Sequence, residues 1–150
     1  MDIVTIAANL ATRFNAANIT PPTGYDDIAL ATYELPNAIT TTPTVLVFPP
    51  EGAFAYPSGY KRSTNLEFPI RFFLAETSDR PRATAALYAW WASLVDQLEG
   101  AYDLDATAKG VTHAVITGMA AGSSEYAEKE YAVIELEVLV HLEQGFSPST

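Results

Sequence analysis

The sequence predicts the α+β class: a mixed, largely antiparallel sheet of about four to five strands, with two helices packed on one face and a long β-hairpin at the end. Three observations support this class. Residues 79–99 carry large apolar side chains at helical spacing, residues 126–143 alternate with a period of two, and strand-like apolar segments precede the long helix. This order of elements is typical of helices gathered on one sheet face.

Length and charge narrow the class of protein. The chain has 150 residues, which suits a single domain over 1–150, and a net charge of −10 from 18 acidic and 8 basic residues. This balance argues against a general nucleic-acid-binding protein and against a partner at an anionic membrane surface. With no cysteine, disulfides and thiolate metal sites are excluded. The first residues lack the basic region of a secretion signal, so we expect the chain to be cytoplasmic at synthesis.

The N-terminal third contains one predicted helix and two predicted strands. Asp2 can cap a helix with apolar residues at helical spacing as far as Ala17, and Asn18 with two prolines ends it. Residues 20–43 are rich in proline, glycine and threonine and are predicted to be irregular, apart from a short edge strand at 28–33. Residues 44–48 are β-branched and apolar, which predicts a buried strand.

Residues 51–61 form an unusual segment, because the aromatic side chains Phe54, Tyr56 and Tyr60 are spread among glycines and prolines. We interpret the segment as a loop. Its aromatic side chains either fold back onto the core or contact a partner, and the sequence leaves both alternatives open.

Residues 63–74 alternate between large apolar and polar side chains, which predicts a strand. Pro69 lies inside this segment and has no amide donor. We therefore expect either an edge strand or a bulge at this position.

The long helix at 79–99 is the predicted anchor of the core. Ser78 or Asp79 can cap its start, Pro81 suits its first turn, and Gly100 can end it. Its apolar stripe consists of Leu87, Trp90, Trp91, Leu94, Val95 and Leu98.

The last third predicts a strand pair. Residues 102–110 form an acidic connection, residues 111–119 a strand, residues 120–125 a turn and residues 126–143 a long strand, followed by a frayed tail at 145–150. The even positions of the long strand are apolar: Ala132, Ile134, Leu136, Val138, Val140 and Leu142.

A search for catalytic chemistry finds little. Pairing His113 directly with His141 would centre the hairpin on residue 127, demanding a wide loop and unpairing residues near Tyr131, so we do not expect a two-histidine metal site. Glu135 and Glu137 lie on one strand face at a spacing compatible with two-carboxylate chemistry. No arrangement around them builds a site, so we interpret Glu135, Glu137 and Glu143 as an acidic face open to water or to another subunit.

Five of the eight basic residues fall within one short span: Lys61, Arg62, Arg71, Arg80 and Arg82. A basic region on one subunit can face an acidic region on the next, and such heterologous contacts close into rings when the rotation permits. Simple solvation of these side chains is the alternative. We take Lys61, Arg62 and Arg71, together with the three aromatic residues of 51–61, as the candidate interface with another subunit or with a tube.

Five segments in order carry a family resemblance: MDIVTIAANLATRF, PTVLVFPPEG, NLEFPIRFFLAE, RATAALYAWWASLVDQLEG and EYAVIELEVLVHLEQ. Through these segments the chain resembles the tail terminator (tail completion) proteins of long-tailed bacteriophages. Similar layouts occur in neighbouring head–tail connector and minor tail proteins, which remain an alternative. A small acid–base enzyme or a ligand-binding domain is a more distant one.

The resemblance implies a virion protein, assembled in the host cytoplasm, that forms a homohexameric ring at the head-proximal end of the tail tube. Such a ring stops polymerisation of the tail-tube protein and joins the tail to a head–tail connector protein. DNA would pass through its lumen without specific binding, and the acidic excess fits a lumen that repels phosphates. The family implies no catalytic residue, cofactor, metal or membrane partner.

Overall fold

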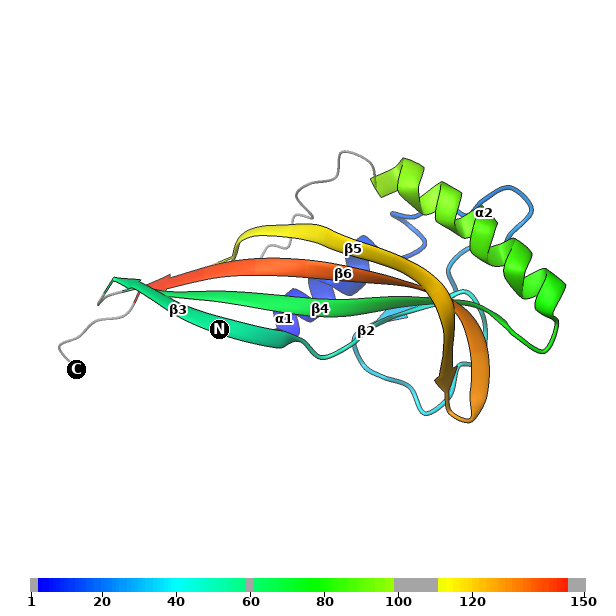
Figure 1. Ribbon diagram of the computed structural model, residues 1–150, viewed down its shortest axis with the longest axis horizontal. Helices are drawn as coiled ribbons and strands as arrows, with labels where there is room; N and C mark the ends of the chain where they lie inside the picture. The colour runs from blue at the N-terminus through cyan, green and yellow to red at the C-terminus, as the bar shows by residue number, and fades with distance from the viewer. Residues whose placement is uncertain (1–2, 59–60, 99–110, 146–150) are drawn as a thin grey trace.

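The computed structural model describes residues 3–58, 61–98 and 111–145; of these, the side chains of 53–58, 61, 111–113 and 144–145 lie outside the description. The class is α+β, with two helices and a mixed, mostly antiparallel sheet of six strands (Figure 1). In chain order the elements are α1 (Ile3–Arg13), β1 (Leu30–Thr32), β2 (Thr44–Val47), β3 (Glu51–Ser58), β4 (Lys61–Glu76), α2 (Arg80–Leu98), β5 (Val111–Tyr126) and β6 (Lys129–Gly145).

The long strands β4, β5 and β6 form the body of the sheet and run along the longest axis of the molecule (Figure 1). The strand order is β1-β2-β4-β6-β5, and β3 also pairs with β4. Only β1 and β2 are parallel; every other pair is antiparallel. β2 and β3 follow one another along the same edge of β4, since Val47 pairs with Ile70 and Glu51 with Glu67.

The main core lies between the two helices and one face of the sheet, which we call the helix face. The predicted even positions of β6 are all buried, and all of them except Ala132 belong to this core, with Phe68, Ile70 and Phe72 of β4. α1 contributes Ile6 and Leu10 to this core, and the buried Phe14 packs edge-on against Phe72 with ring centroids 5.8 Å apart. Alternation in these strands therefore sets which sheet face the helices cover, as predicted.

Helix α2 is confirmed as a core element. Trp90 and Leu94 are buried, and Asp79 caps the helix because its Oδ1 accepts the Arg82 amide N–H at 3.3 Å. Val95, predicted to be buried, is 42% exposed, and the small residues Ala83 and Ala86 are buried instead. The buried stripe is thus displaced toward the first half of the helix, where the buried side chains are small. Gly100, the predicted end of the helix, lies outside the described residues.

Helix α1 ends at Arg13, earlier than the prediction that it reaches Ala17. The Asn15 side chain accounts for this difference, because its Oδ1 accepts the backbone N–H groups of Ala17 and Asn18 and holds the chain in a turn. The predicted cap, Asp2, lies outside the described residues, as does most of the predicted tail at 145–150; Gly145 itself ends β6.

The prediction of a loop at 51–61 is wrong, because residues 51–58 form β3. Local composition suggested a loop, but pairing with β4 supplies the backbone hydrogen bonds that stabilise a strand. The glycine and proline are tolerated because β3 is an edge strand, and the register shifts between Ala55 and Ser58, around Pro57. This extra strand is why the sheet exceeds the predicted four to five.

The prediction that Pro69 makes an edge or a bulge is also wrong. Pro69 lies inside β4, opposite Glu137 of β6, with β2 and β3 along the other side. Its carbonyl accepts the Phe48 N–H at 2.8 Å. Phe48 lies between the end of β2 and the start of β3. Pro69 therefore lacks its amide donor at the point where the partner of β4 changes from β2 to β3.

The predicted turn at 120–125 is wrong as well: these residues belong to β5, and the turn is at Ala127 and Glu128. Two register shifts in β5, between Val111 and His113 and between Ile116 and Gly118, take up extra residues. With these bulges His113 becomes the register partner of His141, a pairing that the sequence does not predict, and Tyr131 stays paired with Ser124.

A second, smaller core lies on the opposite side of the sheet, which we call the open face. The β5–β6 hairpin curls over this face near its tip (Figure 1), and Phe73, Tyr131 and Val133 pack there against Ile39 and Leu46. The Tyr126 hydroxyl donates to the Pro36 carbonyl, and burial raises the pKa of this hydroxyl. The segment around Pro36–Ile39 therefore holds the curled tip in place.

The hairpin turn offers a stability test. Ala127 and Glu128 have left-handed backbone with φ of 51° and 69°, a conformation that Asn-Gly adopts more readily in a two-residue turn. Replacing the pair with Asn-Gly should raise the free energy of unfolding by about 1 kcal/mol, measured by urea denaturation. A Thr-Thr control should lower it, because β-branched residues are strained at positive φ. Equal midpoints for all three proteins would contradict this account of the turn.

Candidate assembly surface

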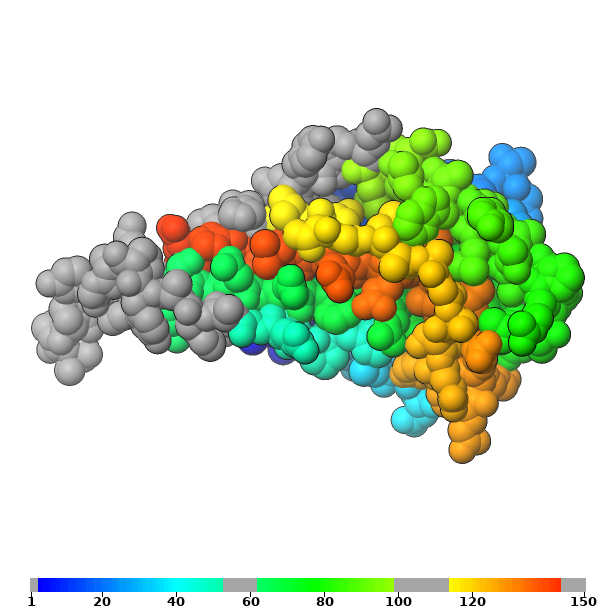
Figure 2. Space-filling model, in the orientation of Figure 1, coloured from blue at the N-terminus to red at the C-terminus, as the bar shows by residue number. Residues whose placement is uncertain are grey.

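The open face carries most of the carboxylates that the structure places on the sheet. Strand alternation puts Glu51, Glu67, Glu135, Glu137 and Glu143 there, and all of these are exposed except Glu135, which is half-buried. Figure 2 views this face, where atoms of β4, β5 and β6 reach the surface beside the curled hairpin tip. The predicted acidic residues Glu135, Glu137 and Glu143 thus share one face, opposite the face on which α1 and α2 pack.

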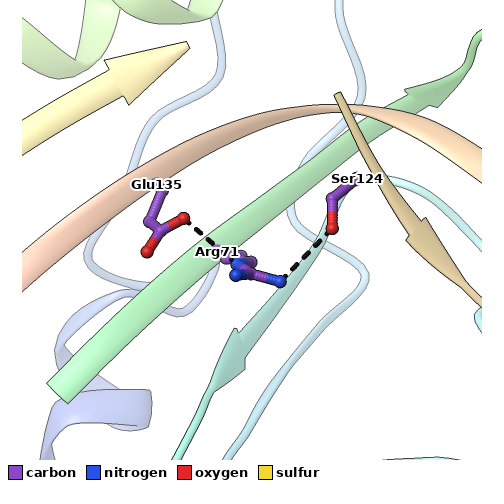
Figure 3. Close-up of polar contacts among 3 residues, drawn as sticks. All are labelled: Arg71, Ser124 and Glu135. Carbon is purple, nitrogen blue, oxygen red and sulfur yellow. Dashed lines mark hydrogen bonds and ion pairs between the residues drawn. The ribbon is translucent and has the colours of Figure 1, made fainter. Parts of the chain in front are cut away.

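Arg71 joins this acidic face rather than a basic one. Its Nε lies 3.2 Å from Oε2 of Glu135, its register partner on β6, and its Nη1 donates to the Ser124 hydroxyl at 3.2 Å (Figure 3). The Phe48 ring lies under the guanidinium, 4.9 Å from ring centroid to Cζ. Arg71 therefore connects β4, β6, the hairpin tip and the link between β2 and β3, and its charge is largely offset by Glu135.

The basic span does not form one continuous surface. Arg62 and Arg71 are nine positions apart on β4, so alternation puts them on opposite faces. Arg80 and Arg82 lie at the start of α2. Tyr60 and the side chains of Phe54, Tyr56 and Lys61 lie outside the described residues; the backbone register places Phe54 opposite Thr64 and Lys61 opposite Gly145.

One open cleft of about 600 Å³ lies between the irregular N-terminal segment and the start of α2. Its charged lining residues are Asp26, Glu76, Asp79, Arg82 and Lys129. Lys129 Nζ lies 3.2 Å from Oε1 of Glu76, and that hydrogen bond and charge raise the pKa of the lysine. None of the residues predicted as a site lines this cleft, and neither histidine does.

His141 lies in a polar cluster on the open face that the sequence analysis missed. Its Nδ1 is 2.6 Å from Oδ1 of Asn65, and its Nε2 is 3.3 Å from the Ser63 hydroxyl and 3.7 Å from Oε1 of Glu143. The cluster follows from the pairing of β4 with β6, in which Asn65 is the register partner of His141. Only the correct strand register could have revealed it.

Strand β5 forms a long free edge of the sheet over the described residues. It pairs with β6 alone and has 16 residues. Proteins protect such edges with lysine, proline or bulges. The two bulges lie before Gly118, whereas the stretch from Gly118 to Tyr126 keeps an unbroken register and contains neither lysine nor proline. This stretch is a ready template for pairing with another strand.

Arg71 allows a test of the contacts that hold the hairpin tip. Arg71→Ala should lower the free energy of unfolding by about 1–2 kcal/mol, because an ion pair, a hydroxyl contact and an aromatic contact are lost together. Arg71→Lys should recover little of this, since an ammonium group cannot make the forked and stacked contacts. Urea denaturation measures both variants, and full stability of Arg71→Lys would contradict the geometric role of the guanidinium.

In the described parts of the chain, neither helix is long and apolar enough to cross a membrane. Searched against family models and curated proteins, the sequence matches none.

Proposed function

We propose that this protein is a structural virion protein, a tail terminator that forms a homohexameric ring on the head-proximal end of a phage tail tube. The observation that carries the proposal is that β5 and β3, on opposite sides of the long strands, each pair with a single strand among the described residues. A subunit with two complementary edges can join head to tail with copies of itself, and such a series closes into a ring when the rotation permits.

The strand directions favour this closure. β5 is antiparallel to β6, and β6 is antiparallel to β4, so β5 runs in the direction of β4. β3 is antiparallel to β4 and therefore runs opposite to β5. Rotation about an axis along the strands preserves these directions, so β5 of one subunit would meet β3 of the next as an antiparallel pair. Antiparallel edges can pair without any crossover connection.

The two sheet faces suit the inside and outside of such a ring. α1 and α2 cover the helix face, which leaves the open face toward the lumen. That face carries Glu67, Glu137 and Glu143, and its Arg71 is offset by Glu135. Retention of DNA depends on phosphate contacts with cationic groups. An acidic lumen therefore lets the genome pass without trapping it.

Another neck or head–tail connector protein could form the same ring. The two functions differ in whether the ring binds the end of the tail tube. An acid–base enzyme gains no support from the site geometry, because Glu137 is exposed and Glu135 is engaged by Arg71. The proposed partners of this protein are copies of itself, the tail-tube protein and a head–tail connector protein. Its proposed location is the virion.

Tube length tests the terminator function. Added in substoichiometric amounts to polymerising tail-tube protein from the same phage, this protein should cap growing ends and shorten the tubes seen by negative-stain microscopy. Charge reversal at Lys61 and at the half-buried Arg62 should weaken the effect at moderate salt, where charge pairs are only partly screened. Arg80→Glu, at the exposed start of α2, serves as the matched control. Unchanged tube lengths with the native protein would contradict the terminator function.

A further inference from the structure

The register of the sheet fixes the height of each edge residue, by which we mean its position along the strand direction. Leu30 of β1 is connected to β5 through successive register partners on β2, β4 and β6. These partners are Thr44, Phe73 and Val133, and the last of them pairs with Gly122 of β5. Leu30 and Gly122 therefore lie at the same height on opposite edges of one subunit.

Two different strands form the edge opposite β5. β3 begins at Glu51, which the register places at the height of Val115, in the bulged half of β5. β1 lies at the height of the unbroken stretch and pairs with β2 alone among the described residues. Because β1 is parallel to β2 and β2 is antiparallel to β4, β1 runs opposite to β5. The unbroken stretch of β5 therefore has β1 as its counterpart on the other side of the subunit.

The side chains at this height are complementary. Gly122 pairs with Val133, which belongs to the smaller core on the open face. Leu30 lies on the same face, because alternation puts its partner Thr44 there together with Leu46. Leu30 is 45% exposed, and a Cβ added at Gly122 meets no atom within 4 Å. A large exposed apolar side chain thus matches a position that has room for it.

We propose that β1 of one subunit pairs with the unbroken stretch of β5 of a second copy of this chain, with Leu30 opposite Gly122. In this antiparallel register Thr32 lies opposite Ala120, since the same series of partners gives these two residues one height. The inference rests on the proposed ring, because rotation about an axis along the strands leaves every height unchanged. The pairing continues the open face from one subunit to the next and covers Leu30.

Cysteine cross-linking tests this register, since the native chain contains no cysteine. Residues directly opposite in an antiparallel pair have Cα atoms about 4.5–5.5 Å apart, within the span of a disulfide. Oxidation of the double variant Thr32→Cys with Ala120→Cys should give covalent multimers up to the hexamer on a denaturing gel. The matched control, Thr32→Cys with Gly118→Cys, moves one cysteine by about 6–7 Å along β5 and should stay monomeric on that gel.

A second pair of variants tests the contact without a disulfide. Leu30→Glu places a charge in the proposed contact, and it should raise the protein concentration at half-assembly by about 10–100-fold, as loss of one buried leucine implies. Leu35→Glu is the matched control, because Leu35 is 44% exposed but lies outside β1. It should assemble as the native protein does. Circular dichroism checks that all variants fold.

Failure of the ring and failure of the register give different results. If native mass spectrometry of the native protein shows monomers alone, the proposed ring is contradicted and this inference is overturned with it. If rings form, the register alone is overturned by any of three results: no cross-link between the cysteines at 32 and 120, equal cross-linking in the Gly118→Cys control, or native-like assembly of Leu30→Glu.

Discussion

Replacing Trp90 or Leu94 with alanine is expected to lower the free energy of unfolding by about 2–5 kcal/mol. Trp90 is 1% exposed and Leu94 is not exposed at all, and both belong to the main core between α2 and the sheet. Each truncation removes buried apolar surface and leaves a cavity that rigid strands on the other side cannot fill. The loss is large relative to the total stability of a domain of this size.

Two residues of the same helix provide the control. Tyr88 is 76% exposed and Val95 is 42% exposed, so alanine at either position should change the free energy of unfolding by about 0.5 kcal/mol or less. Urea denaturation of the four variants separates the two groups. Equal stability for Trp90→Ala and Tyr88→Ala would remove α2 from the core.

Lysines on the free edge of β5 are expected to abolish ring assembly while sparing the subunit. Ala120 and Gly122 are exposed in the unbroken part of β5, and a Cβ added at Gly122 meets no atom within 4 Å. The double variant Ala120→Lys with Gly122→Lys therefore adds charge where another strand would pair, without a clash inside the subunit. Lysine is a natural means of blocking such edges.

The matched control replaces the same two residues with threonine, which adds side-chain volume and favours strands without adding charge. Native mass spectrometry should show a ring for the native and threonine proteins and a monomer for the lysine protein, with similar melting temperatures for both variants. A lysine variant that still assembles would show that β5 is not a subunit edge.

Long periodic segments could be predicted from the sequence, because their side-chain pattern and their environment agree. The alternation in β6 indicates one buried face and is confirmed, and the helical stripe is confirmed at Trp90 and Leu94 but not at Val95. β3 could not be predicted, since Gly52 and Pro57 suggest a loop until β4 lies beside them. Its stability comes from non-local pairing, which a local pattern does not contain.

The turn of the β5–β6 hairpin shows the same limit of prediction from a local sequence pattern. Gly122-Ser123-Ser124 has turn composition but lies in β5, whereas the turn falls at Ala127 and Glu128, which are poor turn residues. That error concealed the register, and with it the His113–His141 pairing. Likewise, Arg71 seemed part of a basic span, although its register partner is Glu135. The sequence could predict which single residues are candidates for a functional site, but not which residues lie beside them in the sheet.

The central claim is that this protein occupies one end of a tail tube, and the most direct test is to locate it there. Tubes assembled from the tail-tube protein of the same phage, mixed with gold-labelled protein, can be imaged by electron microscopy. The account predicts label and a ring-sized density at one end of each tube, with none along its length. Label distributed along the tubes, present at both ends, or absent from them would contradict the claim.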